Sequence, residues 1–211
     1  MNARVEGSAR SYGGKTGAER VAERRARLIA ATIAVLAENG EAHTTMTAVC
    51  SEAGLTERYF YESFTSLDDA MLAALDSVCD EILSLATSTI AATPGEPEAR
   101  VHAVMAAFVD LVEQSPAKAK VAVIHASGNP RLRARRHELI GVFADFVARE
   151  AAVLYGDQAW PAGRARINGL VLIAGFVELV GSWLTGDVEL TAAELVEVSE
   201  DLFASLSRRQ G

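Results

Sequence analysis

The chain has 211 residues, of which 50% are hydrophobic and 23% are charged, a composition that excludes a disordered or collagen-like protein. Its two cysteines, Cys50 and Cys79, form no CxxC pair, so we expect neither a disulfide scaffold nor a metal or cofactor site. The net charge of −8 is unevenly spread: residues 1–36 carry seven Lys or Arg against three Glu, while residues 67–211 carry 12 basic against 20 acidic residues. A basic end on an acidic body indicates a polyanion-binding head.

Apolar residues recur with helical spacing throughout, which predicts an all-α fold of about nine helices. Residues 1–18 are expected to form a flexible, basic tail; the absence of an apolar stretch there argues against a secretory signal and for a cytoplasmic protein. The expected helices span residues 19–38, 46–53, 57–64, 67–89, 97–114, a sixth starting at 116, then 130–155, 161–184 and 191–208.

Local signals mark the helix ends. Gly40 is expected to end the first helix, and Gly54 supplies a tight turn between the second and third. Expected N-caps are Thr44 or Thr45, Thr56, Ser66, Ser115, Asn129 and Thr191.

Three short helices with a glycine in the second turn predict a helix-turn-helix unit. Val49, Cys50 and Ala53 would face inward and brace the third helix. The amino-terminal end of that third helix, which reaches base edges in such units, is polar: Thr56, Glu57, Arg58 and Tyr59.

Within this unit the segments Arg27–Gly40, Thr44–Thr56 and Tyr59–Phe64 resemble the DNA-binding domain of TetR-family transcriptional regulators. The likeness lies in the glycine after the first helix, the paired threonines, Ala-Gly before the third helix, and the aromatic residues within it. The chain departs from the family pattern in having Ser63 where His is common and Leu67 where Lys is usual. The resemblance implies a helix-turn-helix DNA-binding domain over residues 19–66 and an effector-binding and dimerisation domain over residues 67–211.

The resemblance, together with side-chain chemistry, assigns roles in the head. Arg58 is expected to read guanine, the alternative being only an i,i+4 pair with Glu62. Tyr59 would touch a thymine methyl or phosphate, or serve as a scaffold aromatic. Tyr61 would donate its hydroxyl to a phosphate, the alternative being a core residue. The candidate DNA-binding residues are Arg24, Arg25, Arg27, Thr45, Thr47, Thr56, Glu57, Arg58, Tyr59 and Tyr61.

The helix at 161–185 is apolar nearly all round, so it needs a partner on every side. A homodimer through residues 161–185 and 191–208 is expected, with Gly169, Gly175 and Gly181 allowing close approach. A membrane span is the rival interpretation, but Asn168, Glu178 and Ser182 interrupt the helix.

The family resemblance also implies an effector cavity in the body, and the many alanines and glycines favour a mostly apolar effector. Its candidate lining residues, each of which could instead be plain core, are His102, Met105, Phe108, His125, Phe143, Phe146, Trp160, Phe176 and Trp183.

The expected function is a ligand-responsive transcriptional regulator, a repressor that a small effector releases from a palindromic double-stranded operator. Three alternatives stand beside it. An enzyme is disfavoured because no catalytic motif is present. A helical, dimeric protein-interaction module would bind no DNA. Activation in place of repression is not distinguishable from the sequence.

Overall fold

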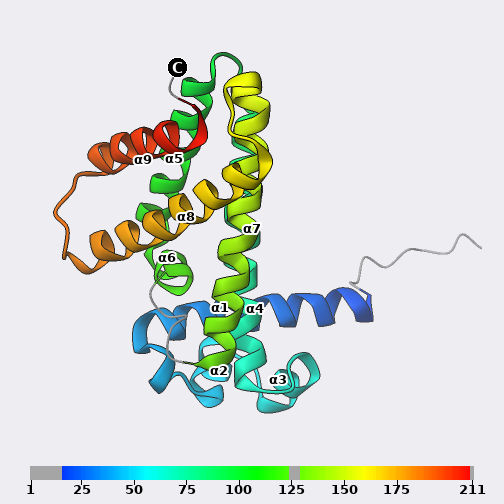
Figure 1. Cartoon of the computed structure of the whole chain (residues 1–211). Coiled ribbons are helices and arrows are strands. Elements are labelled where there is room, and N and C mark those ends of the chain that lie inside the picture. Colours follow the sequence, from blue (N-terminus) through cyan, green and yellow to red (C-terminus); the bar gives the residue numbers. More distant parts are fainter. Residues whose placement is uncertain (1–15, 124–128, 210–211) are drawn as a thin grey trace, which may run out of the picture.

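A computed structural model describes residues 16–123 and 129–209, and every regular element in these ranges is a helix, as predicted (Figure 1). The α-helices are α1 (Gly17–Asn39), α2 (Met46–Ala53), α3 (Glu57–Ser63), α4 (Leu67–Ala92), α5 (Pro97–Gln114), α6 (Pro116–Val123), α7 (Pro130–Tyr155), α8 (Ala162–Thr185) and α9 (Ala192–Ser207). Short 3₁₀ turns at Glu41–His43 and Gly156–Gln158 follow α1 and α7.

The first helix begins earlier than the sequence predicted. Thr16 and Glu19 form a capping box: the Thr16 hydroxyl accepts from the Glu19 amide at 3.2 Å, and the Glu19 carboxylate accepts from the Thr16 amide at 2.6 Å. Residues 17 and 18, assigned to the tail, therefore belong to α1. Residues 1–15, the rest of that predicted tail, lie outside the described residues.

The two candidate caps of α2 have different roles. Thr45 is the N-cap, and its hydroxyl accepts from the Ala48 amide at 3.2 Å. Thr44 is buried and donates to the Gly40 carbonyl at 2.8 Å, closing the turn after α1. Thr56 occupies the N-cap position of α3, but contrary to expectation its side chain makes no capping hydrogen bond.

The helix-turn-helix head is organised around a filled apolar core. Leu28 of α1, Val49 of α2 and Phe60 of α3 are each fully buried and pack in one cluster. Gly54 joins α2 to α3 with φ of +59°, a left-handed conformation that L side chains rarely adopt. The Cys50 thiol is also buried in this core. The core holds α3 in a fixed orientation against α1 and α2.

Helices α1 and α4 connect the head to the body: in Figure 1 α1 crosses the lower part of the molecule, and α4 runs from the head up into the body. A second core cluster joins α1, α4, α6 and α7, with Leu36, Leu75, Val121 and Leu132 almost inaccessible to solvent. Leu67 packs against both this cluster and the head core. The apolar residue at this position, where the family pattern has Lys, therefore ties the two parts together.

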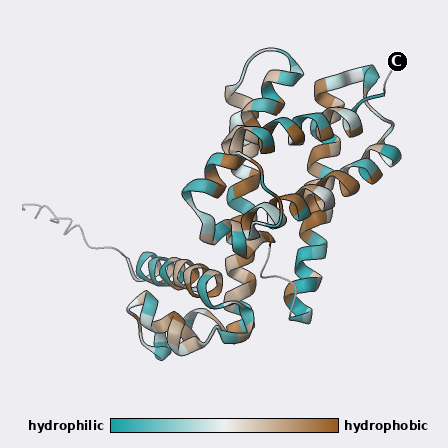
Figure 2. Ribbon diagram, turned by 90° about the vertical axis from the view of Figure 1, so that its left-hand side faces the viewer, coloured by the Kyte–Doolittle hydropathy of each residue, from teal (hydrophilic) through white to brown (hydrophobic). Residues whose placement is uncertain are grey.

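In the body α5, α6 and α7 pack against α4, and α8 and α9 pack against these helices and each other. Teal and brown segments alternate along most of the helices of the body, as amphipathic helices require (Figure 2). Helices α7 and α8 pack closely: a Cβ on Gly169 would lie 2.6 Å from the Ala144 carbonyl oxygen. The close approach expected of Gly169 at a dimer interface is therefore made within the subunit. A Cβ on Gly181 would meet Val123 at 3.1 Å, whereas one on Gly175 would meet open space.

Candidate DNA-binding surface and effector cavity

The outer face of α3 presents a group of exposed polar side chains. The side chain of Arg58 is 85% exposed, and Tyr61 is 61% exposed and lies edge-on to the buried Phe60 ring. Arg58 Nε donates to Glu62 Oε1 at 3.1 Å, so the i,i+4 pair considered as the alternative role is present. An ion pair this exposed contributes little to stability and breaks at low cost, so the Arg58 side chain remains available to bind a base.

The remaining candidates of α2 and α3 flank this group. Thr47, Thr56 and Glu57 are exposed, and Tyr59 is borderline at 36%. Thr45 is exposed, and its hydroxyl oxygen caps α2. This oxygen therefore lies beside the first backbone amides of α2, which have no hydrogen-bond acceptor within the helix. The structure thus leaves these side chains accessible on the head surface, and their contacts with DNA stay predictions.

The arginines of α1 pack on the head itself. The Arg24 guanidinium lies 4.6 Å from the Tyr59 ring centroid and 3.6 Å from the Glu62 carboxylate. The Arg25 guanidinium lies 4.4 Å from the centroid of Phe64. These cation–π contacts hold the aromatic side chains of α3 against α1.

Arg27 has a structural role that the sequence did not reveal. Its Nη2 donates to the carbonyl of Ala53 at the end of α2, and a Cβ added to Gly54 would lie 3.3 Å from the same nitrogen. This hydrogen bond fixes the turn between α2 and α3. Arg27 therefore has a bracing role at this turn, and because its side chain is exposed, its contact with phosphate stays a prediction.

A cavity of about 150 Å³ lies in the body between α4, α5, α6, α7 and α8, with α9 contributing at one side. Its wall is almost entirely apolar, and its largest side chains are Phe108, Phe143, Phe146, Phe176 and Phe203. Phe108 and Phe176 lie with ring centroids 5.1 Å apart. A volume of roughly 150 Å³ in an apolar wall is enough to hold a benzene-sized molecule.

The predicted lining residues divide into two groups. Met105, Phe108, Phe143, Phe146 and Phe176 line the cavity.

The other predictions are corrected by the structure. His102 has an exposed side chain that pairs with Glu200. The indole nitrogen of Trp183 donates to the Leu190 carbonyl at 2.8 Å, and Trp160 packs beneath Arg164. None of these three side chains lines the cavity. His125 lies outside the described residues.

Arg136, which was not among the predicted residues, lines the cavity from α7. Leu132, Leu139, Ile140 and Phe143 share its helical face at spacings of three, four and seven residues. A charged residue within an apolar stripe was the signal that could have identified it. Among the described residues, no group of three or more His, Cys, Asp or Glu side chains is placed to hold a metal ion.

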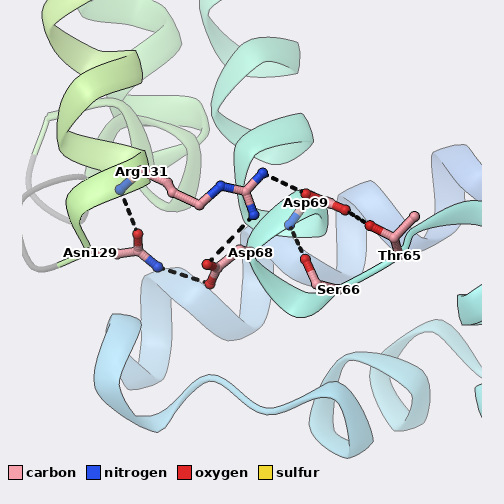
Figure 3. A network of polar contacts seen from close by, with 6 residues as sticks. All are labelled: Thr65, Ser66, Asp68, Asp69, Asn129 and Arg131. Carbon is pink, nitrogen blue, oxygen red and sulfur yellow. Dashed lines mark hydrogen bonds and ion pairs between the residues drawn. The ribbon is translucent and has the colours of Figure 1, made fainter.

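A polar network joins the beginning of α4 to the beginning of α7 (Figure 3). Arg131 donates to Asp69 at 2.8 Å and lies 3.7 Å from Asp68, and the Asn129 amide donates to Asp68 at 2.8 Å. Thr65 also donates to Asp69. Hydrogen bonds from Thr65 and then from Arg131 lower the pKa of Asp69 below its usual value. The network connects the end of the head directly with the helix that carries Arg136.

One face of α8 carries apolar side chains that no element within the described chain covers. Ile167 and Val171 are 55% and 57% exposed, and Ala174 is exposed on the same side. On α9, Val198 is 43% exposed, whereas Leu195, also predicted at the interface, is fully buried within the subunit.

Helix α8 is also long and apolar enough to cross a membrane by length and composition, which is weak evidence on its own. Asn168 is buried and donates to the Leu206 carbonyl of α9 at 2.9 Å, and Val180 is fully buried against α5 and α6 residues. These contacts place α8 as a packed helix of the body.

No protein-family model and no curated protein matches this chain. Solved structures do match. The fatty acid degradation regulator FadR of Bacillus halodurans aligns with a TM-score of 0.72 at 15% identity, over 93% of this chain and 100% of its own.

Two further structures extend the likeness. A TetR-family transcriptional regulator from Streptomyces coelicolor aligns with a TM-score of 0.67 at 19% identity, over 88% of this chain and 80% of its own. FadR of Bacillus subtilis, solved in complex with stearoyl-CoA, aligns with a TM-score of 0.67 at 18% identity, over 86% and 97%. The chain has the fold of TetR-family transcriptional regulators.

Proposed function

We propose that this protein is a DNA-binding transcriptional regulator whose affinity for its operator is controlled by a small molecule bound in the body. One observation carries the proposal: a helix-turn-helix with a buried apolar core exposes the polar side chains of α3, while the body of the same chain contains a cavity with an apolar wall. The structural neighbours support it, because they are transcriptional regulators, and one of them was solved with stearoyl-CoA.

In the proposed complex α3 lies in the major groove. Arg58 leaves Glu62 and grips the O6 and N7 atoms of a guanine, a contact worth about 1–3 kcal/mol of discrimination. Glu57 and Tyr59 lie beside it toward the base edges, and Tyr61 donates its hydroxyl to a phosphate.

Phosphate contacts fix the register of this complex. The exposed Thr45, Thr47 and Thr56 lie near the amino-terminal ends of α2 and α3, where backbone amides favour anions. Thr56 is the best placed of the three, because its hydroxyl makes no capping bond and is available to a phosphate oxygen. Arg24 and Arg25 contribute charge from the adjacent helix α1.

The proposed regulator acts as a homodimer, since two heads on a two-fold axis read two half-sites about 34–36 Å apart or a multiple of that distance. The uncovered apolar face of α8, with Ile167 and Val171, and Val198 of α9 supply the surface. Self-association would remove these side chains from water.

The proposed effector occupies the cavity and has a mostly apolar body, because the wall offers it almost only hydrocarbon. Binding would favour a conformation whose two heads are wrongly spaced for the operator, so that the repressor is released. A switch from 99:1 to 1:99 needs roughly 10⁴-fold preference for one conformation. The bonds of Arg131 to Asp68 and Asp69 and the continuous helix α4 provide the mechanical connection.

Selection from a random double-stranded DNA library tests the proposal. The purified full chain is expected to enrich an inverted repeat, and an Arg58→Ala variant is expected to lose enrichment at one position of each half-site. An Arg149→Ala variant, which alters an exposed arginine near the end of α7 that lies away from the head in Figure 1, serves as the matched control and should enrich the same sequence. A wild-type protein that enriches no sequence would contradict the proposal and favour a protein-interaction module.

A further inference from the structure

The cavity wall contains one polar group whose hydrogen-bonding capacity is not met. The Nε atom of Arg136 is buried and has no hydrogen-bond partner, and the side chain makes no ion pair with any residue the structure describes. A buried donor without a partner costs about 1–3 kcal/mol, and a charged group costs more. The Arg136 side chain as a whole is half-buried, so its guanidinium borders the cavity with one buried donor, Nε, left for a ligand to satisfy.

The other polar side chains of the wall are already satisfied. Lys118 donates to both carboxylate oxygens of Glu81, at 2.7 and 2.8 Å. Ser199 donates to the Leu195 carbonyl at 2.6 Å. Burial raises the pKa of the Cys79 thiol to about 12, so it lines the cavity as a neutral, weakly polar group. Within the described lining, Arg136 alone offers an unpaired charge.

We propose that the ligand of this cavity is a carboxylic acid with a compact apolar body, and that Arg136 binds its carboxylate. The guanidinium fork matches a carboxylate with two parallel, charge-assisted hydrogen bonds. The apolar body lies among the phenylalanines of the wall, where Phe108, Phe143 and Phe176 exclude water. The inference rests on the proposed effector site and gives its ligand a chemical class: an aromatic ring or short alkyl chain with one acid group fits the volume.

The position of Arg136 also explains how binding of such a ligand in the cavity is transmitted to the head. The preceding residue, Arg135, donates to Asp76 of α4 at 2.7 Å, and Arg131 binds Asp68 and Asp69 about one turn earlier. A carboxylate that draws Arg136 into the cavity acts on the helix whose amino-terminal end is fastened to α4. The helix that would bind the carboxylate, α7, is thus the same helix that is connected to the head.

Isothermal titration of the full chain tests the inference with three pairs of probes: hexanoate, octanoate and decanoate, each against the alcohol of equal chain length. At least one acid is expected to bind about tenfold or more tightly than its alcohol, the ratio that one charge-assisted hydrogen bond supplies. Arg136→Met, of similar volume, should weaken that acid about tenfold and leave the alcohol unchanged. Arg133→Met, the same change at an exposed position of α7, should bind like the wild type.

Two further measurements separate carboxylate binding from an effect on folding and from binding of a thioester. Arg136→Met should leave the thermal unfolding midpoint of the ligand-free protein unchanged or raise it, because it removes an unpaired buried group. The coenzyme A thioester of the same chain, which lacks the free carboxylate, should bind more weakly than the acid.

Equal affinity for acids and alcohols, or a thioester that binds tightly and ignores Arg136→Met, would overturn the carboxylate assignment. Either result would leave the proposed regulator standing. DNA selection by Arg136→Met, which should match the wild type, reports on that proposal separately.

Discussion

The head and the body of this chain differ in how their interiors are packed. In the head Leu28, Val49 and Phe60 are fully buried in one apolar core, and the side chains proposed to bind DNA project outward from it. In the body the phenylalanines surround a void, and the unpaired Arg136 borders it. A filled core holds a reading surface rigid, whereas a hollow core admits a ligand and can change shape when it is occupied.

The largest expected effect concerns these two interiors. Phe60→Ala should cost about 3–5 kcal/mol of unfolding free energy, the range for truncating a buried phenylalanine. Phe143→Ala should cost clearly less, because Phe143 is half-buried and already borders a void. Urea denaturation followed by circular dichroism measures both. Equal losses would show that the body is as tightly filled as the head.

The contrast also separates what the sequence could predict from what it could not. The elements of the head follow from local signals, such as Gly54 in its left-handed turn and Thr45 at the start of α2. Helix bounds in the body were equally predictable because Pro97, Pro116 and Pro130 begin helices there.

The cavity exists where apolar side chains of different helices leave space between them. Helical periodicity shows which side chains face inward, but not whether they pack against each other. Met105 and Trp183 have the same periodic signal, yet only Met105 lines the void. The network of Asn129 and Arg131 with Asp68 and Asp69 joins residues about 60 positions apart. No local pattern pairs such distant groups.

The next prediction concerns how the two heads are brought together. Val171→Arg places a charge on the uncovered face of α8 and should convert a dimer to a monomer in sedimentation velocity. DNA affinity should then fall by about 10²–10⁴, the gain that linking two binding modules provides. Val153→Arg is the control: Val153 is 73% exposed, and lies nine residues along α7 from Ala144, on the side away from α8. A dimeric Val171→Arg variant would place the interface elsewhere.

A smaller effect is expected from a single side chain on the reading surface. Arg58→Ala should weaken binding to the selected duplex by about 1–3 kcal/mol and relax the base preference at one position. Its unfolding free energy should stay within about 0.5 kcal/mol of the wild type, because the side chain is 85% exposed. Fluorescence anisotropy and urea denaturation give the two numbers. If the variant lost stability but kept its affinity for DNA, Arg58 would have only the role of an ion-pair partner of Glu62.

The smallest effect is a pH dependence at the junction of head and body. Because the pKa of Asp69 is lowered in the folded protein, its contribution to stability is full above the unfolded value near pH 4 and disappears as the pH falls through the folded value. The stability difference between wild type and Asp69→Asn should therefore be constant from about pH 7 to 5 and shrink below about pH 4. Asp80→Asn, an exposed position on α4, is the control. A difference that grows on acidification would contradict the network.

The salt dependence of DNA binding by the full chain tests the central claim most directly. With the selected duplex, the logarithm of the association constant should fall linearly with the logarithm of salt concentration between about 50 and 200 mM, since each phosphate contact releases counterions. A slope near −4 would correspond to about four such contacts. Binding that does not change over this range, or no preference for the selected duplex over a scrambled one, would contradict the assignment of α3 as a DNA-reading helix.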